Sequence, residues 1–304
     1  MFNNIIGNDE NKSNLKKIID NNNVSHSYIF SGISGIGKFL FAKEFAKAIL
    51  CLNPDVKQKP CGFCKACESI ENGNNPDIII IDEHDESIKT EQIKELTNNV
   101  LEKPIQGERK IYIINNSENM TREAQNSLLK TLEEPPEYAI IILVTSNDNL
   151  LLNTIKSRCI KISFQKLSDK EIIEYFNQNN GNIEKKLLRA FNGSIEKAIN
   201  IMDKKEIYEG VEEVFENIEN YNELQILNLK DKVFKDKDEV LSILDYINTI
   251  FYYKTLHNIQ RAVKYEKCIE IIEETKLRLK RNSNYDMTID NCLLAIWEVI
   301  RTDG

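Results

Sequence analysis

The sequence predicts an α/β fold, a parallel sheet flanked by helices, followed by a region built from helices alone. A glycine-rich segment, Gly32–Phe39, follows the apolar run 28–30 and opens a helically periodic segment at 40–50. Further apolar runs alternate with periodic segments, whereas strand signals fade after Leu167 and helical periodicity continues from there. Such alternation of strands and helices is typical of a parallel, doubly wound sheet.

Five apolar runs are expected to be the strands of this sheet, and periodic segments between them its helices. The expected strands are residues 28–30, 78–81, 111–114, 139–144 and 159–162, and the expected helices are 8–22, 40–50, 88–101 and 121–132. Ligands of such sheets bind at the carboxyl ends of the strands, where the glycine-rich segment lies. In residues 206–304, apolar stripes such as Ile243, Ile247 and Ile250 indicate the core of a helical bundle.

The glycine-rich segment has the strand–loop–helix context of a phosphate-binding P-loop. Its residues Gly32, Gly35 and Gly37 would let backbone N–H groups surround an anion, and Lys38 adds a positive charge. A working P-loop has Ser or Thr next, whose hydroxyl binds Mg²⁺, but position 39 is Phe39. The residues alone leave open a working nucleotide enzyme, a P-loop scaffold without its chemistry, and a chance glycine loop.

Composition and charge limit the classes of protein to which this chain can belong. The formal charge of −8 argues against a predominantly basic nucleic-acid footprint, and 29% charged residues with few Gly and Pro indicate a helix-rich globular protein. No apolar run approaches the roughly 20 residues that span a bilayer. The first residues, Met1–Gly7, lack the basic head and apolar centre of a signal peptide. We therefore expect a cytoplasmic protein with reduced thiols.

Four cysteines near the predicted P-loop helix have the spacing of a metal site. Cys61, Cys64 and Cys67 form overlapping Cys-x-x-Cys pairs, and Cys51 precedes them. Four thiolates suit the tetrahedral shell that Zn²⁺ prefers, and a fully protein-bound ion would be structural rather than catalytic. A redox pair and a group of unrelated cysteines are the alternatives. The dispersed Cys159, Cys268 and Cys292 are expected in the core.

Two polar pairs end predicted strands, and the acidic one is a candidate Walker B site, which organises Mg²⁺ and the attacking water. Asp82–Glu83 follows the run 78–81, and Asn115–Asn116 follows the run 111–114. The acidic pair is a candidate on its residues, because sequence alone does not order the strands of a sheet.

Several stretches resemble the AAA+ clamp-loader family of bacterial DNA polymerase III. They are His26–Gly32 before the P-loop, the cysteine insertion after its helix, Ala124–Pro136, Thr154–Cys159 with its Ser157-Arg158-Cys159 motif, and Asn282, Asn284 and Asn291 with Leu293 and Leu294. The resemblance covers essentially the whole chain. It implies an AAA+ P-loop domain at 1–165 with a zinc module at 51–76, a helical lid domain at 166–205 and a helical collar domain for oligomerisation at 206–304.

The resemblance also implies which strand carries the Walker B pair. In the family it is the strand that here ends in Asn115 and Asn116, so both carboxylates are replaced. Together with Phe39, these substitutions remove the anchors of Mg²⁺ and the base for water, so no ATPase activity is expected from this chain alone. Gly32, Gly35, Gly37 and Lys38 would then bind nucleotide weakly or not at all.

By the same resemblance, Arg158 projects from one subunit toward ATP bound on its neighbour. A guanidinium supplied in trans stabilises charge on the transferred phosphoryl group. The alternative is an arginine that pairs with an acid at the edge of the sheet. Gly193–Lys197 resembles the second sensor motif, with Lys197 where arginine is usual, and Thr145–Asn147 corresponds to the first sensor region.

The function that this resemblance implies is that of a non-hydrolysing subunit in a hetero-pentamer. Its partners would be motor subunits of the gamma/tau type and a delta-type subunit, and the complex would load the sliding clamp onto primed DNA. An active motor subunit is the alternative, and a zinc-dependent nucleic-acid-binding module is a third class. That class predicts basic residues near the cysteines, where only Lys57, Lys59 and Lys65 lie, with acids close by.

Overall fold

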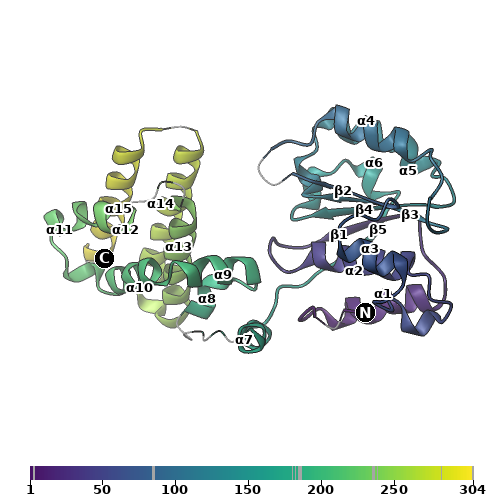
Figure 1. The fold of residues 1–304 in the computed structure, drawn as a ribbon. Coiled ribbons are helices and arrows are strands. Elements are labelled where there is room, and N and C mark those ends of the chain that lie inside the picture. Colours follow the sequence, from purple (N-terminus) through teal and green to yellow (C-terminus); the bar gives the residue numbers. More distant parts are fainter. Residues whose placement is uncertain are drawn as a thin grey trace. The chain divides into compact units, whose positions relative to one another are not determined.

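The protein consists of two compact units in the computed structural model (Figure 1). The structure describes residues 1–302 except 3, 84–85, 180, 182, 184–186, 235–236, 238 and 282. The sheet unit comprises Met1–Asn182 with Asn192–Glu196, and the helical unit comprises Ile183–Phe191 with Lys197–Gly304. The three-domain division with boundaries after residues 165 and 205 stays a prediction.

The sheet unit contains the predicted five-stranded parallel sheet. Its strands are β1 (Ser27–Ser31), β2 (Ile78–Asp82), β3 (Lys110–Asn115), β4 (Ala139–Thr145) and β5 (Ile160–Ser163). They lie in the order β2-β3-β4-β1-β5, and every neighbouring pair is parallel. The expected α/β fold class is thereby confirmed, with β2 and β5 as the edge strands.

Helices cover both faces of this sheet (Figure 1). On one face lie α1 (Asp9–Asp20), α2 (Lys38–Leu50) and α3 (Lys65–Glu71), and on the other lie α4 (Thr90–Asn99), α5 (Arg122–Glu133) and α6 (Asn153–Lys156). The alternation of side chains along a strand explains the two layers, because Tyr28 and Phe30 join one apolar cluster and Ile29 joins the other. The unit also contains α7 (Asp169–Gln178) and short 3₁₀ turns at Val56–Gln58, Ser117–Asn119 and Asp148–Leu150.

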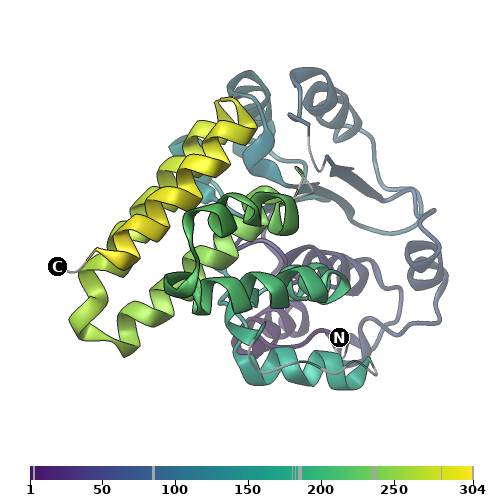
Figure 2. The same cartoon turned by 90° about the vertical axis from the view of Figure 1, so that its left-hand side faces the viewer.

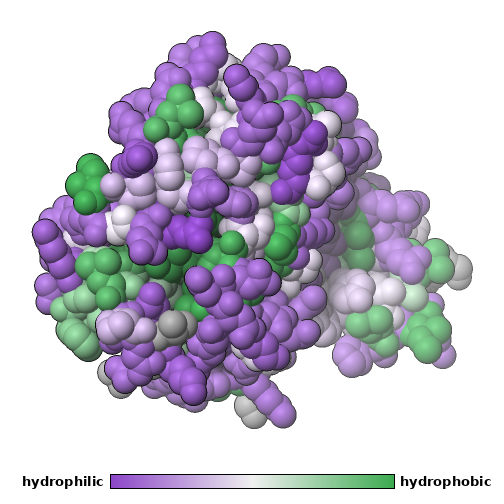
Figure 3. Space-filling view, turned by 90° about the vertical axis from the view of Figure 1, so that its right-hand side faces the viewer, coloured by the Kyte–Doolittle hydropathy of each residue, from purple (hydrophilic) through white to green (hydrophobic). Residues whose placement is uncertain are grey.

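Apolar side chains also reach the surface in places. The face in Figure 3 is mainly hydrophilic, with hydrophobic residues in several separate groups. Exposed apolar residues of the sheet unit include Phe63, Leu101 and Ile105. Single exposed apolar residues are normal on a folded protein.

The remaining helices form a bundle, as the periodicity of residues 206–304 predicts (Figures 1 and 2). They are α8 (Leu188–Phe191), α9 (Ile195–Asp203), α10 (Lys205–Glu216), α11 (Glu223–Leu227), α12 (Leu229–Val233), α13 (Val240–His257), α14 (Ala262–Lys280) and α15 (Tyr285–Arg301), with 3₁₀ turns at Ile218–Asn220 and Ile259–Arg261. The predicted stripe residues Ile243, Ile247 and Ile250 are buried. Among the described helices, none combines the length and apolar character needed to cross a bilayer.

The described residues of the expected collar signature lie at the N-cap and within α15. The side chain of Asn284 accepts a hydrogen bond from the backbone N–H of Met287 at 3.0 Å and so caps this helix. Leu293 is buried in the bundle. Asn282 lies outside the described residues.

Candidate functional site

The glycine-rich segment connects β1 to α2, as its sequence context predicts. Gly35 and Gly37 have φ angles of 74° and 87°, and Gly37 is the N-cap of α2. Glycine adopts such positive φ angles without the steric penalty that other residues incur. The loop therefore has the strand–loop–helix geometry of a phosphate-binding site.

Lys38, the cation of this loop, is already bound within the chain. Its Nζ donates a hydrogen bond to the carbonyl of Ile33 at 2.6 Å, and only 6% of the residue is exposed. Burial lowers the pKa of Lys38 to about 8, although the nearby carboxylates of Glu118 and Glu196 act in the opposite direction. The environment of the ammonium group thus contains two acids of the chain itself.

A segment at the start of α9 packs directly against the loop. The backbone N–H groups of Ile195 and Glu196 donate to the carbonyl of Gly35 at 3.0 and 3.3 Å. The hydroxyl of Ser34 donates to Glu196 Oε2 at 3.1 Å. A Cβ atom at Gly35 would lie 2.2 Å from Ser194 Oγ, so this glycine allows the close approach.

The residue of the expected sensor segment that faces the loop is Glu196 rather than Lys197. The ammonium group of Lys197 instead lies 3.9 Å from Asp245 Oδ2, within the helical unit. The sequence motif does not single out Glu196, because a motif match identifies a segment, whereas the rotation of α9 decides which side chain of the segment meets the loop.

Phe39 occupies the position at which a P-loop hydroxyl would bind Mg²⁺. Its ring packs against the apolar core on the α2 face of the sheet. The Nζ atom of Lys43 lies 4.4 Å from the ring centroid, in a cation–π contact. The side chain at this position offers a metal ion no oxygen.

The order of the strands places the two candidate Walker B pairs at different distances from the P-loop strand. β3, which ends in Asn115, is separated from the P-loop strand β1 by β4 alone, whereas β2, which ends in Asp82, is the edge strand beyond it. The amide of Asn115 donates to Asp82 Oδ1 at 2.7 Å, and the amide of Asn116 donates to the carbonyl of Glu83 at 3.1 Å. The strand nearer to the P-loop therefore ends in two amides.

Glu118 is a second acid near the loop, at a position for which the sequence predicts no role. The Oε1 atom of Glu118 accepts hydrogen bonds from the hydroxyl of Ser146 and, at 2.9 Å, from the backbone N–H of Ser146. Its Oε2 is buried without a hydrogen-bond partner among the described residues. The adjoining Thr145 accepts a local bond from the N–H of Asn147 at 3.1 Å. No sequence motif marks Glu118, because it lies in a polar turn after β3.

Arg158 lies between α6 and β5 and forms an ion pair. Its Nη2 is 2.6 Å from Glu133 Oε1, at the end of α5, and its Nη1 donates to the carbonyl of Thr154 at 2.8 Å. The side chain remains 33% exposed. The structure thus contains the acid pairing that was the alternative for Arg158, and it leaves the guanidinium accessible at the surface.

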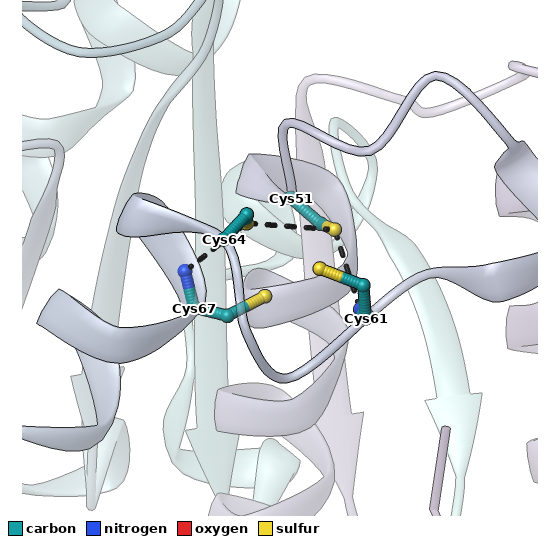
Figure 4. Close-up of side chains that lie close together, drawn as sticks. All are labelled: Cys51, Cys61, Cys64 and Cys67. Atoms are coloured by element: carbon teal, nitrogen blue, oxygen red, sulfur yellow. Dashed lines mark hydrogen bonds between the residues drawn. The ribbon is translucent and has the colours of Figure 1, made fainter.

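The four predicted metal-binding cysteines converge (Figure 4). Cys51 follows α2, Cys64 is the N-cap of α3, and Cys67 lies in the first turn of that helix. All four sulfur atoms lie within 4.8 Å of one another, and those of Cys51 and Cys64 are 3.9 Å apart. A tetrahedral Zn²⁺ site with Zn–S bonds near 2.3 Å places its sulfurs about 3.8 Å apart. The cluster therefore has the dimensions to hold a metal ion.

Backbone N–H groups donate to two sulfur atoms of this cluster, although burial raises the pKa of Cys51 and of Cys67. The N–H of Cys61 donates to Cys51 Sγ at 3.4 Å, and that of Cys67 donates to Cys64 Sγ at 3.5 Å. Although burial acts in the opposite direction, hydrogen bonds from the backbone of Cys67 and Leu52 lower the pKa of Cys64 to about 6. Thiolates are the form of cysteine that binds metals. Cys268 and Cys292 are buried elsewhere, as expected, and Cys159 is partly buried.

Known proteins resemble this chain in both sequence and structure. It is 36% identical over 210 residues to the DNA polymerase III subunit tau/gamma of Haemophilus influenzae, and 39% identical over 158 residues to subunit delta' of Bacillus subtilis. These matches cover 66% and 52% of this chain but 30% and 47% of the two relatives. The chain therefore spans less than half the length of either protein.

A solved structure shares the fold. It is that of a DNA polymerase III gamma subunit-related protein from Thermotoga maritima, with a TM-score of 0.55 and 21% sequence identity, covering 94% of this chain and 98% of that one. The sequence profile described as "DNA polymerase III, delta subunit" matches residues 7–168, which is more than half of the chain. The chain belongs to this DNA polymerase III subunit family.

Proposed function

We propose that this chain is a subunit of the DNA polymerase III clamp loader that does not hydrolyse ATP itself. The observation that carries the proposal is the chemistry at three positions, Phe39, Asn115 and Asn116. Phosphoryl transfer depends almost wholly on positioning and on charge stabilisation by metal ions and cations. Phe39 has no oxygen for Mg²⁺, and the amide groups of Asn115 and Asn116 already donate to β2 and the residue after it. An amide also cannot accept a proton from an attacking water.

The proposed partners follow from the kinds of relative that the chain resembles. Subunits tau/gamma and delta' of DNA polymerase III are among them, which supports an assembly with motor subunits of the gamma/tau type and a delta-type subunit. In this hetero-pentamer the chain would assist ATP-dependent loading of the sliding clamp onto primed DNA. Residues 166–205 would form the lid, and residues 206–304 the collar through which subunits assemble.

Within this complex we assign Arg158 to a neighbouring subunit's ATP. Its guanidinium is one-third exposed and is held by one acid, Glu133, which is itself half-exposed. Exposed ion pairs contribute only about 0–1 kcal/mol, so a phosphate on a neighbour can compete for this arginine. In this assignment, Glu133 holds the guanidinium until the neighbour's nucleotide replaces it.

The proposal predicts that Arg158→Ala lowers ATPase activity in the assembled complex without preventing assembly. A trans arginine contributes roughly 10³–10⁵ in rate in well-studied GTPases, so we expect a clear loss of DNA- and clamp-stimulated turnover at the dependent site. Arg158→Lys should also fail, because an ammonium group cannot contact two phosphate oxygens through a planar fork. Lys156→Ala, a neighbouring cation in α6, is the matched control. Unchanged turnover with both Arg158 variants would leave Arg158 as a structural ion-pair residue.

A Glu133→Gln variant further distinguishes a role of Arg158 in trans from a purely structural role in its ion pair. If the arginine acts only through its pair with Glu133, removal of either partner should cause the same defect. If it acts in trans, Glu133→Gln frees the guanidinium and should leave turnover at or above that of the wild type. The measurement is the ATPase rate of complexes that differ only at positions 133 and 158.

An active motor subunit is the second candidate, and the identity of 36% to a tau/gamma subunit favours it. The two candidates differ in the isolated chain, which hydrolyses ATP only if it is a motor subunit.

We further propose that Cys51, Cys61, Cys64 and Cys67 bind a structural Zn²⁺. All four tetrahedral positions would then be filled by protein, which leaves none for a substrate or a water.

A further inference from the structure

We propose that Glu196 closes the P-loop of this chain against nucleotides, by placing a carboxylate of the protein itself at the phosphate-binding loop. The inference rests on the proposed function in one respect, namely that this P-loop no longer serves hydrolysis. It goes further in assigning the exclusion to a residue outside the P-loop, in the first turn of α9.

Glu196 contacts the loop through both its backbone and its side chain. Its backbone N–H donates to the carbonyl of Gly35 at 3.3 Å, next to the bond from Ile195 at 3.0 Å. Its Oε2 accepts the hydroxyl hydrogen of Ser34 at 3.1 Å. Because a Cβ at Gly35 would lie 2.5 Å from the Cβ of Glu196, the two segments have no space between them at this point.

The charges around the loop also oppose an anion. Lys38 is the cation of the P-loop, and its ammonium group donates to the carbonyl of Ile33. Both Glu118 and Glu196 lie near enough to act on its charge. Two carboxylates therefore outnumber one ammonium group, whereas a nucleotide's phosphates would add further negative charge. The like charges disfavour binding, and the bond to Ile33 would compete with a phosphate for Lys38.

Glu196→Gln tests this assignment with little disturbance of the fold. Glutamine keeps the size of the side chain and an oxygen that accepts from Ser34, but it removes the negative charge. Glu196 is exposed, so salt screens part of its effect and the variant should matter most at low ionic strength. Asp203→Asn, which neutralises an exposed acid at the other end of the same helix, is the matched control.

The experiment measures binding of a fluorescent ATP analogue and of ADP to the purified full-length chain. The buffer contains no added magnesium and no chelator, so that a metal bound to the cysteines is retained. We expect Glu196→Gln to bind about tenfold or more tightly than the wild type and the Asp203→Asn control, a change comparable to one charge-assisted interaction. The difference should narrow as salt is added.

A double variant tests whether the gain in nucleotide binding arises at the P-loop. Glu196→Gln combined with Lys38→Met, which keeps the buried chain length without the charge, should return to wild-type affinity. Equal affinities of wild type and Glu196→Gln would overturn the proposal, as would gained binding that persists without Lys38. If Glu118→Gln tightens nucleotide binding and Glu196→Gln does not, the exclusion of nucleotides would be assigned to Glu118 instead. None of these outcomes depends on the complex, so failure of the Arg158 test and failure of this inference are distinguishable.

Discussion

At the scale of single residues, small chemical changes account for the proposed loss of catalysis. Phe39 replaces a hydroxyl with a ring, which packs on the core and beneath Lys43. Asn115 and Asn116 replace possible carboxylates with amides that bond to the neighbouring strand and the residue after it. Each of these side chains has contacts within the fold, so the site keeps its shape although it lacks the groups needed for ATP hydrolysis.

Burial of the Cys292 thiol predicts how the stability of the protein depends on pH. Burial raises the pKa of Cys292 in α15 from 9.0 to about 11. The unfolded state therefore loses this proton at a lower pH than the folded state, so the stability that the thiol contributes is lost as pH rises from 9 toward 11. Between pH 8 and 10 the wild type should lose about 1.4 kcal/mol more than Cys292→Ala in free energy of unfolding. Urea titrations at the two pH values check this, and parallel curves for the two proteins would contradict it.

At the scale of elements, the cysteine module depends on two helices and the turn between them. α2 presents Cys51 at its end, and α3 begins at the residue after Cys64. Lys47 in α2 also pairs with Glu71 in α3, so the helices are joined beside the cluster. The rest of the sheet unit has its own apolar core, which contains neither Cys61 nor Cys64.

Removal of the metal should therefore loosen the module without unfolding the sheet. We predict that the chain purified without chelator contains zinc, and that Cys61→Ser/Cys64→Ser lacks it. In that variant, hydrogen exchange should quicken in residues 51–76, while β3 and β4 keep their protection. Metal analysis and exchange mass spectrometry test the two statements, with Cys159→Ser as the control for loss of a thiol outside the cluster. Zinc-free wild-type protein would refute the assignment.

At the scale of the whole molecule, the proposed function divides the work between this chain and its partners. The isolated chain should hydrolyse ATP no faster than the background rate, because nothing at Phe39, Asn115 or Asn116 organises Mg²⁺ or water. The measurement is steady-state phosphate release from pure protein, with Lys38→Met as the control for a contaminating ATPase. Turnover that disappears in the Lys38 variant would favour the motor-subunit alternative.

Much of the fold could be predicted from local pattern. Five apolar runs identified the five strands to within a few residues, because buried parallel strands are apolar throughout. Periodicity identified α1, α2, α4 and α5, although the run expected at 88–101 forms a helix only over Thr90–Asn99. The short helices α3 and α6 were not predicted. The spacing of Cys51, Cys61, Cys64 and Cys67 was sufficient to predict their cluster, since a short insertion between two helix ends brings its own residues together.

By itself, the sequence determined the strands, the longer helices, the loop geometry at Gly35 and Gly37 and the group of cysteines, all of which arise from residues close together in the chain. Only the tertiary structure decided that β3, and not β2, lies nearer to the P-loop strand, that Arg158 meets Glu133, and that Glu118 and Glu196 lie beside Lys38. Glu196 is more than 150 residues from Ser34, to which it is hydrogen-bonded. Such contacts depend on strand order and helix rotation, which result from packing of the whole unit and leave no periodic signal in the local sequence.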